Sequence, residues 1–269
     1  MLVSVGYPYG LQDSQLRQSF YKGLPAWDAN ASFAFWLAAM MSETERKFER
    51  QDDVMFDSES MSLLYAGNRN KLMVPVGALT PPIYFAQGPM AYNYGALGSM
   101  MGHALMHAID LRGITVETDG RGSYDDTERL LGHYRQRLPC LRRLLDKSKG
   151  KEPGSSPDYL DPFADSENLA SVMGTRLAYE AFRQETSGYR DPLLPWSDPS
   201  RGGYDAEQLF FVAHCAPLCK FREEVEHSSH GMGRDRCLRP LMNMREFSDA
   251  FQCPRGSFMN PADKCIIFH

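Results

Sequence analysis

The segment from Tyr92 to Ile109 constrains the fold most, because it reads as one mostly buried helix that carries two histidines. Met, Leu, Ala and Gly fill it, and the glycines at positions 95, 98 and 102 recur at near-helical spacing, which allows close packing. His103 and His107 are four positions apart, so both imidazoles face the same side of the helix. The segment therefore predicts a core helix that presents two potential metal ligands.

A metal ion would need a third ligand from elsewhere in the chain. Glu167 opens a later predicted helix, in the string SENLASVMG. Two histidines and one glutamate leave zinc an open fourth position, which is the catalytic arrangement. On spacing alone, ordinary core or surface contacts of the two histidines are the commoner explanation, so the pair by itself is weak evidence.

Helix-like patterns outnumber strand-like ones along the chain. The sequence predicts helices over residues 12–22, 32–52, 92–109, 125–147, 167–186, 204–220 and 245–251. Strand-like runs cover residues 58–65 and 71–79, with GNRN between them as a turn. The helix over residues 32–52 begins apolar and ends charged, as a half-buried helix would. We expect one α+β domain over residues 1–269, mostly α-helical, with one small sheet.

Charge and hydropathy exclude two classes of partner. The net charge is −5 and no long basic run occurs, which argues against nucleic acid as a partner. The longest apolar stretch, Phe33 to Met41, is too short to span a bilayer, and the first ten residues do not resemble a signal peptide. The expectation is a chain that stays inside the cell or a piece of a longer exported protein.

An even count of six cysteines suits disulfides in an oxidising compartment, with buried free thiols as the alternative.

Five blocks of sequence carry a resemblance to a known family. They occur in the order VPVGALTPPIYF, AYNYGALGSMMGHALMHAID, ENLA, QLFFVAHCAPLC and MREFSDAFQCPRGSFMNPADKC. Together they closely resemble the C-terminal catalytic domain of the neprilysin and endothelin-converting-enzyme family, from about Gly6 to the end. The resemblance implies a zincin-like, thermolysin-type metallopeptidase domain that acts on peptides at the cell surface or outside cells. It also implies that the large N-terminal capping domain of the family is absent here, in a fragment, a partial gene model or a shortened paralogue.

The resemblance carries over the zinc site with two departures. His103, His107 and Glu167 match the three ligands of one Zn²⁺ ion. Ala104 stands where the family has the glutamate that acts as general base on the zinc-bound water. Ser171 stands where the family has an aspartate that supports a zinc histidine, so we expect weakened zinc binding.

The residues that would hold substrate are also implied by the resemblance. Ser62 and Leu63 match an Asn-Ala pair on an edge strand that binds the substrate backbone. His230 matches the histidine that stabilises the oxyanion, with His227 as an alternative. Arg236 matches an arginine that binds a substrate carbonyl or carboxylate.

The family also implies which cysteines pair. Cys140 and Cys265 match two cysteines that form a disulfide. Cys219 and Cys253 match cysteines whose partners lie in the N-terminal region, so we expect them to be unpaired here or to mispair with Cys215 or Cys237.

Three functions are compatible with these residues. The first is a pseudopeptidase that binds zinc and peptides but has lost catalysis. The second is an active, atypical zinc metalloendopeptidase of extracellular peptides in which another group replaces the base, and the third is a structural remnant without metal. Asp110 lies one turn beyond His107, which suits a residue that supports a ligand and not a base.

Overall fold

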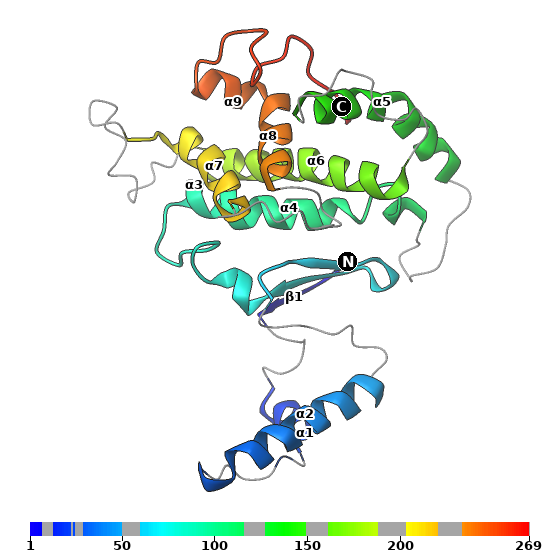
Figure 1. The fold of residues 1–269 in the computed structure, drawn as a ribbon, viewed down its shortest axis with the longest axis vertical. Coiled ribbons are helices and arrows are strands. Elements are labelled where there is room, and N and C mark those ends of the chain that lie inside the picture. Colours follow the sequence, from blue (N-terminus) through cyan, green and yellow to red (C-terminus); the bar gives the residue numbers. More distant parts are fainter. Residues whose placement is uncertain are drawn as a thin grey trace.

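The computed structural model describes residues 1–6, 13–22, 24, 29–49, 60–115, 127–148, 161–187, 203–219 and 233–268. These residues are mostly helical and include one small sheet, which confirms the predicted fold class (Figure 1). The strands are β1 (Leu2–Gly6), β2 (Leu64–Ala66) and β3 (Lys71–Pro75). The α-helices are α1 (Ser14–Phe20), α2 (Ser32–Glu49), α3 (Met90–Asn93), α4 (Ser99–Met106), α5 (Thr127–Ser148), α6 (Pro162–Glu185), α7 (Ala206–Cys215), α8 (Gly233–Asn243) and α9 (Arg245–Ala250).

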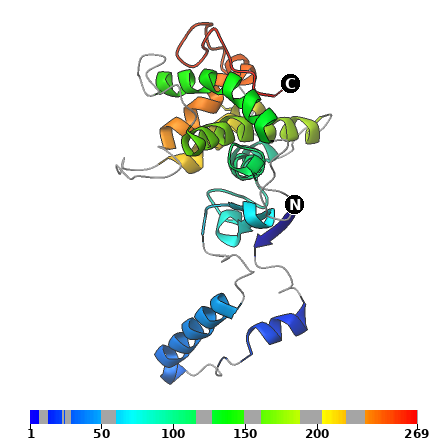
Figure 2. The same cartoon turned by 90° about the vertical axis from the view of Figure 1, so that its right-hand side faces the viewer.

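The helix α4 lies between the sheet and the other large helices. In both views the sheet is on one side of α4, whereas α6 is on the other side, with α5 and α8 beyond it (Figures 1 and 2). A π-helical turn over Tyr94–Gly98 joins α3 to α4, so that the chain is continuously helical from Met90 to Met106. The predicted core helix is therefore present, although it ends three residues earlier than expected.

The helices α4 and α6 cross in backbone contact. A Cβ atom on Gly102 would lie 2.2 Å from the carbonyl oxygen of Gly174, and one on Gly174 would lie 2.4 Å from the backbone nitrogen of His103. Any side chain at either position would therefore force the two helices apart. This crossing brings the histidine face of α4 against Glu167 and Ser171 of α6, which are both buried.

The sheet contains one strand that the sequence analysis missed. The strand order is β1-β3-β2, with β1 parallel and β2 antiparallel to β3. Leu2 pairs with Lys71, so the partner of β1 lies far along the chain and no hairpin signal marks it. Of the strands predicted over residues 58–65 and 71–79, the described residues form β2 over Leu64–Ala66 and β3 over Lys71–Pro75, because a 3₁₀ turn over Val76–Leu79 follows β3. Residues 58 and 59 lie outside the described part of the chain.

One helix was not predicted, and another begins earlier than predicted. The structure has α8, for which the sequence analysis predicted no helix, because Pro240 inside it weakens the helical pattern. The helix α6 begins at Pro162, five residues before the predicted start, because the side chain of Asp161 caps the N–H groups of Phe163 and Ala164. The start was therefore marked by an Asp-Pro pair that the prediction did not use.

The helix α2 forms as predicted, but the described residues do not bury its apolar side. Phe33, Trp36 and Met41 are 73%, 55% and 58% exposed, which corrects the expectation of a half-buried helix. In both views α1 and α2 lie apart from the helical body (Figures 1 and 2). Among the described helices, none combines the length and the apolar character that a membrane span requires.

The described residues contain two disulfides. The expected bridge between Cys140 and Cys265 is present and ties α5 to the C-terminal segment. A second bridge joins Cys215 of α7 to Cys237 of α8, so these two cysteines pair with each other and not with Cys219 or Cys253. Cys219 and Cys253 are in neither bridge, in agreement with the expectation that they are unpaired.

Removing the bridge between Cys140 and Cys265 should destabilise the protein strongly. The bridge closes a loop with a sequence separation of 125 residues. In the chain-entropy model, opening a loop of this length costs about 4–5 kcal/mol of unfolding free energy. We expect the free energy of unfolding of the double variant Cys140→Ser/Cys265→Ser to fall by most of that amount. The measurement is denaturant unfolding under oxidising conditions. A variant at the exposed Cys219, Cys219→Ser, is the control and should unfold like the wild type.

Candidate metal centre and cavity

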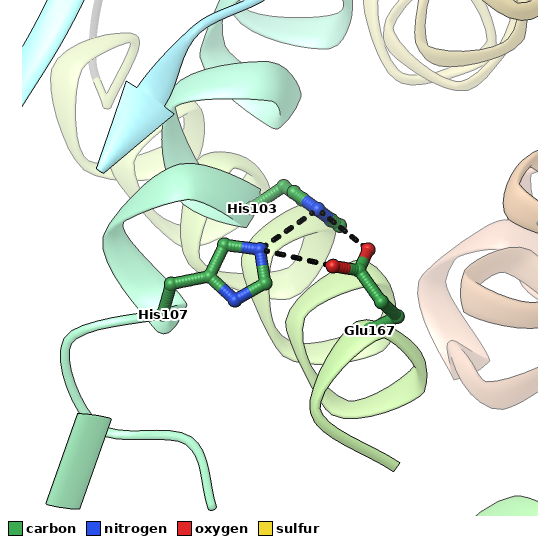
Figure 3. Close-up of side chains that lie close together, drawn as sticks. All are labelled: His103, His107 and Glu167. Atoms are coloured by element: carbon green, nitrogen blue, oxygen red, sulfur yellow. Dashed lines mark hydrogen bonds and ion pairs between the residues drawn. The ribbon is translucent and has the colours of Figure 1, made fainter. Parts of the chain in front are cut away.

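Three potential ligand side chains from two helices meet at one point. The Nε2 atoms of His103 and His107 are 3.3 Å apart, and they lie 3.4 and 3.6 Å from the two carboxylate oxygens of Glu167 (Figure 3). Donors about 2.0–2.1 Å from a tetrahedral zinc ion lie about 3.3–3.4 Å from one another. The three side chains therefore fit a zinc ion with one open position. No other group of three such side chains was found among the described residues.

The electrostatics of the site keep one histidine neutral. Burial is the main cause that lowers the pKa of His103 to about 4, and the nearby charge of Arg236 lowers it further. The imidazole ring is thus uncharged at neutral pH, and one of its two ring nitrogens carries a lone pair that a cation can bind.

A carboxylate fixes the orientation of His107. The Nδ1–H group of His107 donates to Asp110 Oδ2 over 2.6 Å, which leaves Nε2 as the lone-pair nitrogen facing Glu167. The other oxygen of Asp110 accepts the backbone N–H groups of Arg112 and Gly113, both at 2.8 Å. Asp110 is fully buried and bonded to three groups, so it orients His107, which is the arrangement expected of a residue that supports a potential ligand.

The support for His103 is weaker. The hydroxyl of Ser171 lies 3.4 Å from His103 Nδ1, at the long end of the hydrogen-bond range. The two histidines therefore have unequal partners: His107 has a short bond to a carboxylate, whereas His103 has a long contact to a neutral hydroxyl.

Ala104 lies beside both histidines and lines the large cavity in front of them. Its methyl group is 2% exposed and packs in the cluster that contains Leu72 and Val74 of β3. A methyl group has no donor or acceptor, so this position can neither accept nor release a proton.

The cavity in front of the histidines has a volume of about 1080 Å³. Ser62 and Leu63 line it and directly precede β2, which is an edge strand of the sheet. Among the described residues, the only carboxylates in its lining are those of Asp110 and Glu167. The lining thus combines an edge strand, where an extended chain could pair, with the three potential ligands.

The structure places Arg236 near the candidate metal centre, whereas the predicted oxyanion histidine lies outside the described part of the chain. Arg236 of α8 lines a second, smaller cavity that also contains His103 and Ser171. His230 and its alternative His227 lie outside the described residues. His214 of α7 shares the smaller cavity. It lies in the family-like block QLFFVAHCAPLC, but the sequence analysis gave it no role, because nothing in that block shows that it lies near His103.

Comparisons with known proteins show what this chain is similar to. The sequence matches Peptidase family M13 over residues 63–267. It is 26% identical to Neprilysin-11 of Caenorhabditis elegans over 281 residues, covering 100% of this chain and 32% of the relative. It is 28% identical to endothelin-converting enzyme 1 of Cavia porcellus over 278 residues, covering 98% of this chain and 35% of the relative. The chain thus spans about a third of the length of these curated relatives.

Solved structures share the fold. The Haemonchus galactose containing glycoprotein complex superposes with a TM-score of 0.75 at 20% identity, covering 100% of this chain and 43% of that one. The zinc metalloprotease ZMP1 of Mycobacterium tuberculosis, in complex with an inhibitor, superposes with a TM-score of 0.66 at 19% identity, covering 98% of this chain and 41% of that one. At these identities the likeness shows the fold.

Proposed function

The chain belongs to Peptidase family M13, a family of neprilysin-like zinc metallopeptidases, and from this premise we propose that it is a pseudopeptidase that binds zinc and peptides. In this proposal His103, His107 and Glu167 hold one zinc ion. Catalysis is lost because Ala104 occupies the position of the general base.

The observation that carries the proposal is the state of the carboxylates in the large cavity. A zinc-bound water needs a base that takes its proton and passes it to the leaving amine. Among the described residues, the two carboxylates that line the cavity are both engaged: Glu167 faces the two imidazoles, and Asp110 holds His107. Neither is available to replace a base at position 104.

Peptide binding rests on the shape of the cavity and on its edge strand. An extended peptide can add to a free strand edge through main-chain hydrogen bonds. Ser62 and Leu63 stand at that edge, and the cavity of about 1080 Å³ lies beside them. Ser62 is shorter than the asparagine of the family pattern, which favours weaker binding of the peptide backbone.

An oxidising location is part of the proposal. Two disulfides among the described residues support a cell-surface or extracellular setting, because such bonds persist mainly in oxidising compartments. The peptides bound would then be extracellular ones.

The second candidate is an active, atypical zinc metalloendopeptidase. It is favoured by the three donors, whose separations suit a tetrahedral zinc ion with an open position for water. A zinc-bound water keeps some nucleophilicity without a base.

One assay separates the two candidates. The zinc-loaded chain is incubated with a library of quenched fluorescent peptides, and binding is followed in parallel by fluorescence polarisation. We expect peptide binding that falls when zinc is chelated, with no cleavage above the His103→Ala control. Chelator-sensitive cleavage by the wild type that is lost in that control would favour the active enzyme instead.

A further inference from the structure

Several buried polar atoms without partners surround one small cavity behind His103. Ser99 Oγ, His214 Nδ1 and Arg236 Nε are all buried and have no hydrogen-bond partner among the described residues. All three side chains line a cavity of about 20 Å³, together with His103 and Ser171. A buried water needs about 10–15 Å³ and two to four polar partners, so the cavity has room for one water molecule.

The donors and acceptors around this cavity can be assigned from their other contacts. When His103 presents the Nε2 lone pair to a metal, its Nδ1 carries the proton and is a donor. Arg236 Nε is also a donor, since a guanidinium has no acceptor. His214 Nε2 lies 3.3 Å from the carbonyl oxygen of Arg236 and donates to it, so the Nδ1 atom of His214 is an acceptor.

These roles match one water molecule. A water accepts two hydrogen bonds, here from the N–H groups of His103 and Arg236. It donates two hydrogen bonds, here to His214 Nδ1 and to a serine hydroxyl. Either Ser171 or Ser99 can be that acceptor, since both line the cavity. An anion suits the site less well, because the lone pair of His214 would face it.

We propose that a water molecule in this cavity, held by His214 and Arg236, supports the zinc ligand His103 in place of a carboxylate at position 171. The inference rests on the proposed zinc site. The water gives the His103 Nδ1–H group the acceptor that Ser171, at 3.4 Å, provides only weakly. His214 thereby becomes a positioning residue of the metal centre, which acts through the water.

The fold holds the two residues that bind the water in fixed positions. His214 and Arg236 each precede one cysteine of the disulfide between Cys215 and Cys237, whose Cα atoms are 4.9 Å apart. The bridge therefore fastens α7 to α8 at this cavity. His214 is 7% exposed, so few alternative conformations are open to it.

A double-mutant cycle on zinc affinity tests the proposal. His214→Phe fills the space but removes the acceptor, and we expect zinc to bind about 10-fold more weakly, at the lower end of the about 10–100-fold range for groups that support a ligand. His214→Asn, which keeps an acceptor near the position of Nδ1, should recover most of the affinity. In a Ser171→Asp background the carboxylate replaces the water, so His214→Phe should change the affinity less than about 2-fold.

The outcomes distinguish this inference from the proposed function. If the wild type binds no zinc, the proposed function fails. If the wild type binds zinc but His214→Phe has the same effect in both backgrounds, the water-mediated role is wrong. A crystal structure of the zinc-loaded wild type should show one water in contact with His103, His214 and Arg236, absent from Ser171→Asp. A dry cavity, or a halide there after a bromide soak, would also overturn the proposal.

Discussion

Replacing His107 by alanine should abolish stoichiometric zinc binding, with a loss of affinity of about 10²–10³-fold. Structural zinc sites with four ligands bind with apparent free energies of about 10–16 kcal/mol, or about 2.5–4 kcal/mol for each ligand. At about 1.4 kcal/mol for each factor of ten, one lost ligand costs two to three orders of magnitude. The same result is expected for His103→Ala, because both Nε2 atoms lie within 3.6 Å of Glu167.

A graded series makes this prediction sharper. Asp110→Asn keeps a side chain against His107 but removes the charge, so the affinity for zinc should fall by about 10–100-fold. Ser171→Asp should act in the opposite direction, since it supplies a carboxylate to His103. The exposed His133 of α5 provides the matched control, and His133→Ala should leave zinc content unchanged. Zinc is measured by elemental analysis of protein purified without chelator and by competition with a chromophoric chelator. Only trace zinc in the wild type, unchanged in His107→Ala, would contradict the site.

The metal-binding helix could be predicted from the sequence because its signals are local or recognisable. Spacing alone placed His103 and His107 on one face of a helix, and small residues predicted the close crossing that Gly102 and Gly174 provide. Glu167 was a candidate third ligand because it opens a later predicted helix, and the family resemblance then matched it to the ligand set, although nothing local links it to a helix sixty residues earlier. The crossing of α4 and α6 brings the two histidines within 3.6 Å of the Glu167 carboxylate.

What the sequence did not reveal depends on contacts between distant segments. The strand β1 pairs with β3 across more than sixty residues, and a run of five residues carries too little pattern to be noticed. The exposed apolar side of α2 could not be anticipated either, because amphipathic patterns predict burial without naming the partner. His214 matters only through its neighbours Arg236 and Ser171, which come from two other helices. The pairing of Cys215 with Cys237 was missed for the same reason.

The second large effect concerns catalysis, and it should require several changes together. Ala104→Glu alone should restore little peptidase activity, because position 171 still offers His103 Nδ1 a serine hydroxyl at 3.4 Å and no carboxylate, and Ser62 still contacts a peptide weakly. The cavity beside position 104 has a volume of about 1080 Å³, which leaves space for a glutamate side chain that turns away from the apolar cluster of Leu72 and Val74. Adding Ser171→Asp and Ser62→Asn should therefore allow the new carboxylate to act on a firmly held zinc-bound water.

The size of this effect follows from the role of the base. A positioned general base contributes about 10²–10⁴-fold to a hydrolytic rate. In the background of Ser171→Asp and Ser62→Asn, we expect the variant with Glu at position 104 to cleave quenched peptides faster than the variant with Gln there by that factor. Glutamine has nearly the same shape but cannot accept the proton, so this pair isolates proton transfer from packing. The further change His103→Ala should remove the gain, since it removes a zinc ligand. Equal rates for Glu and Gln at position 104, in variants that bind zinc fully, would show that the missing base is not what keeps this domain from cleaving peptides.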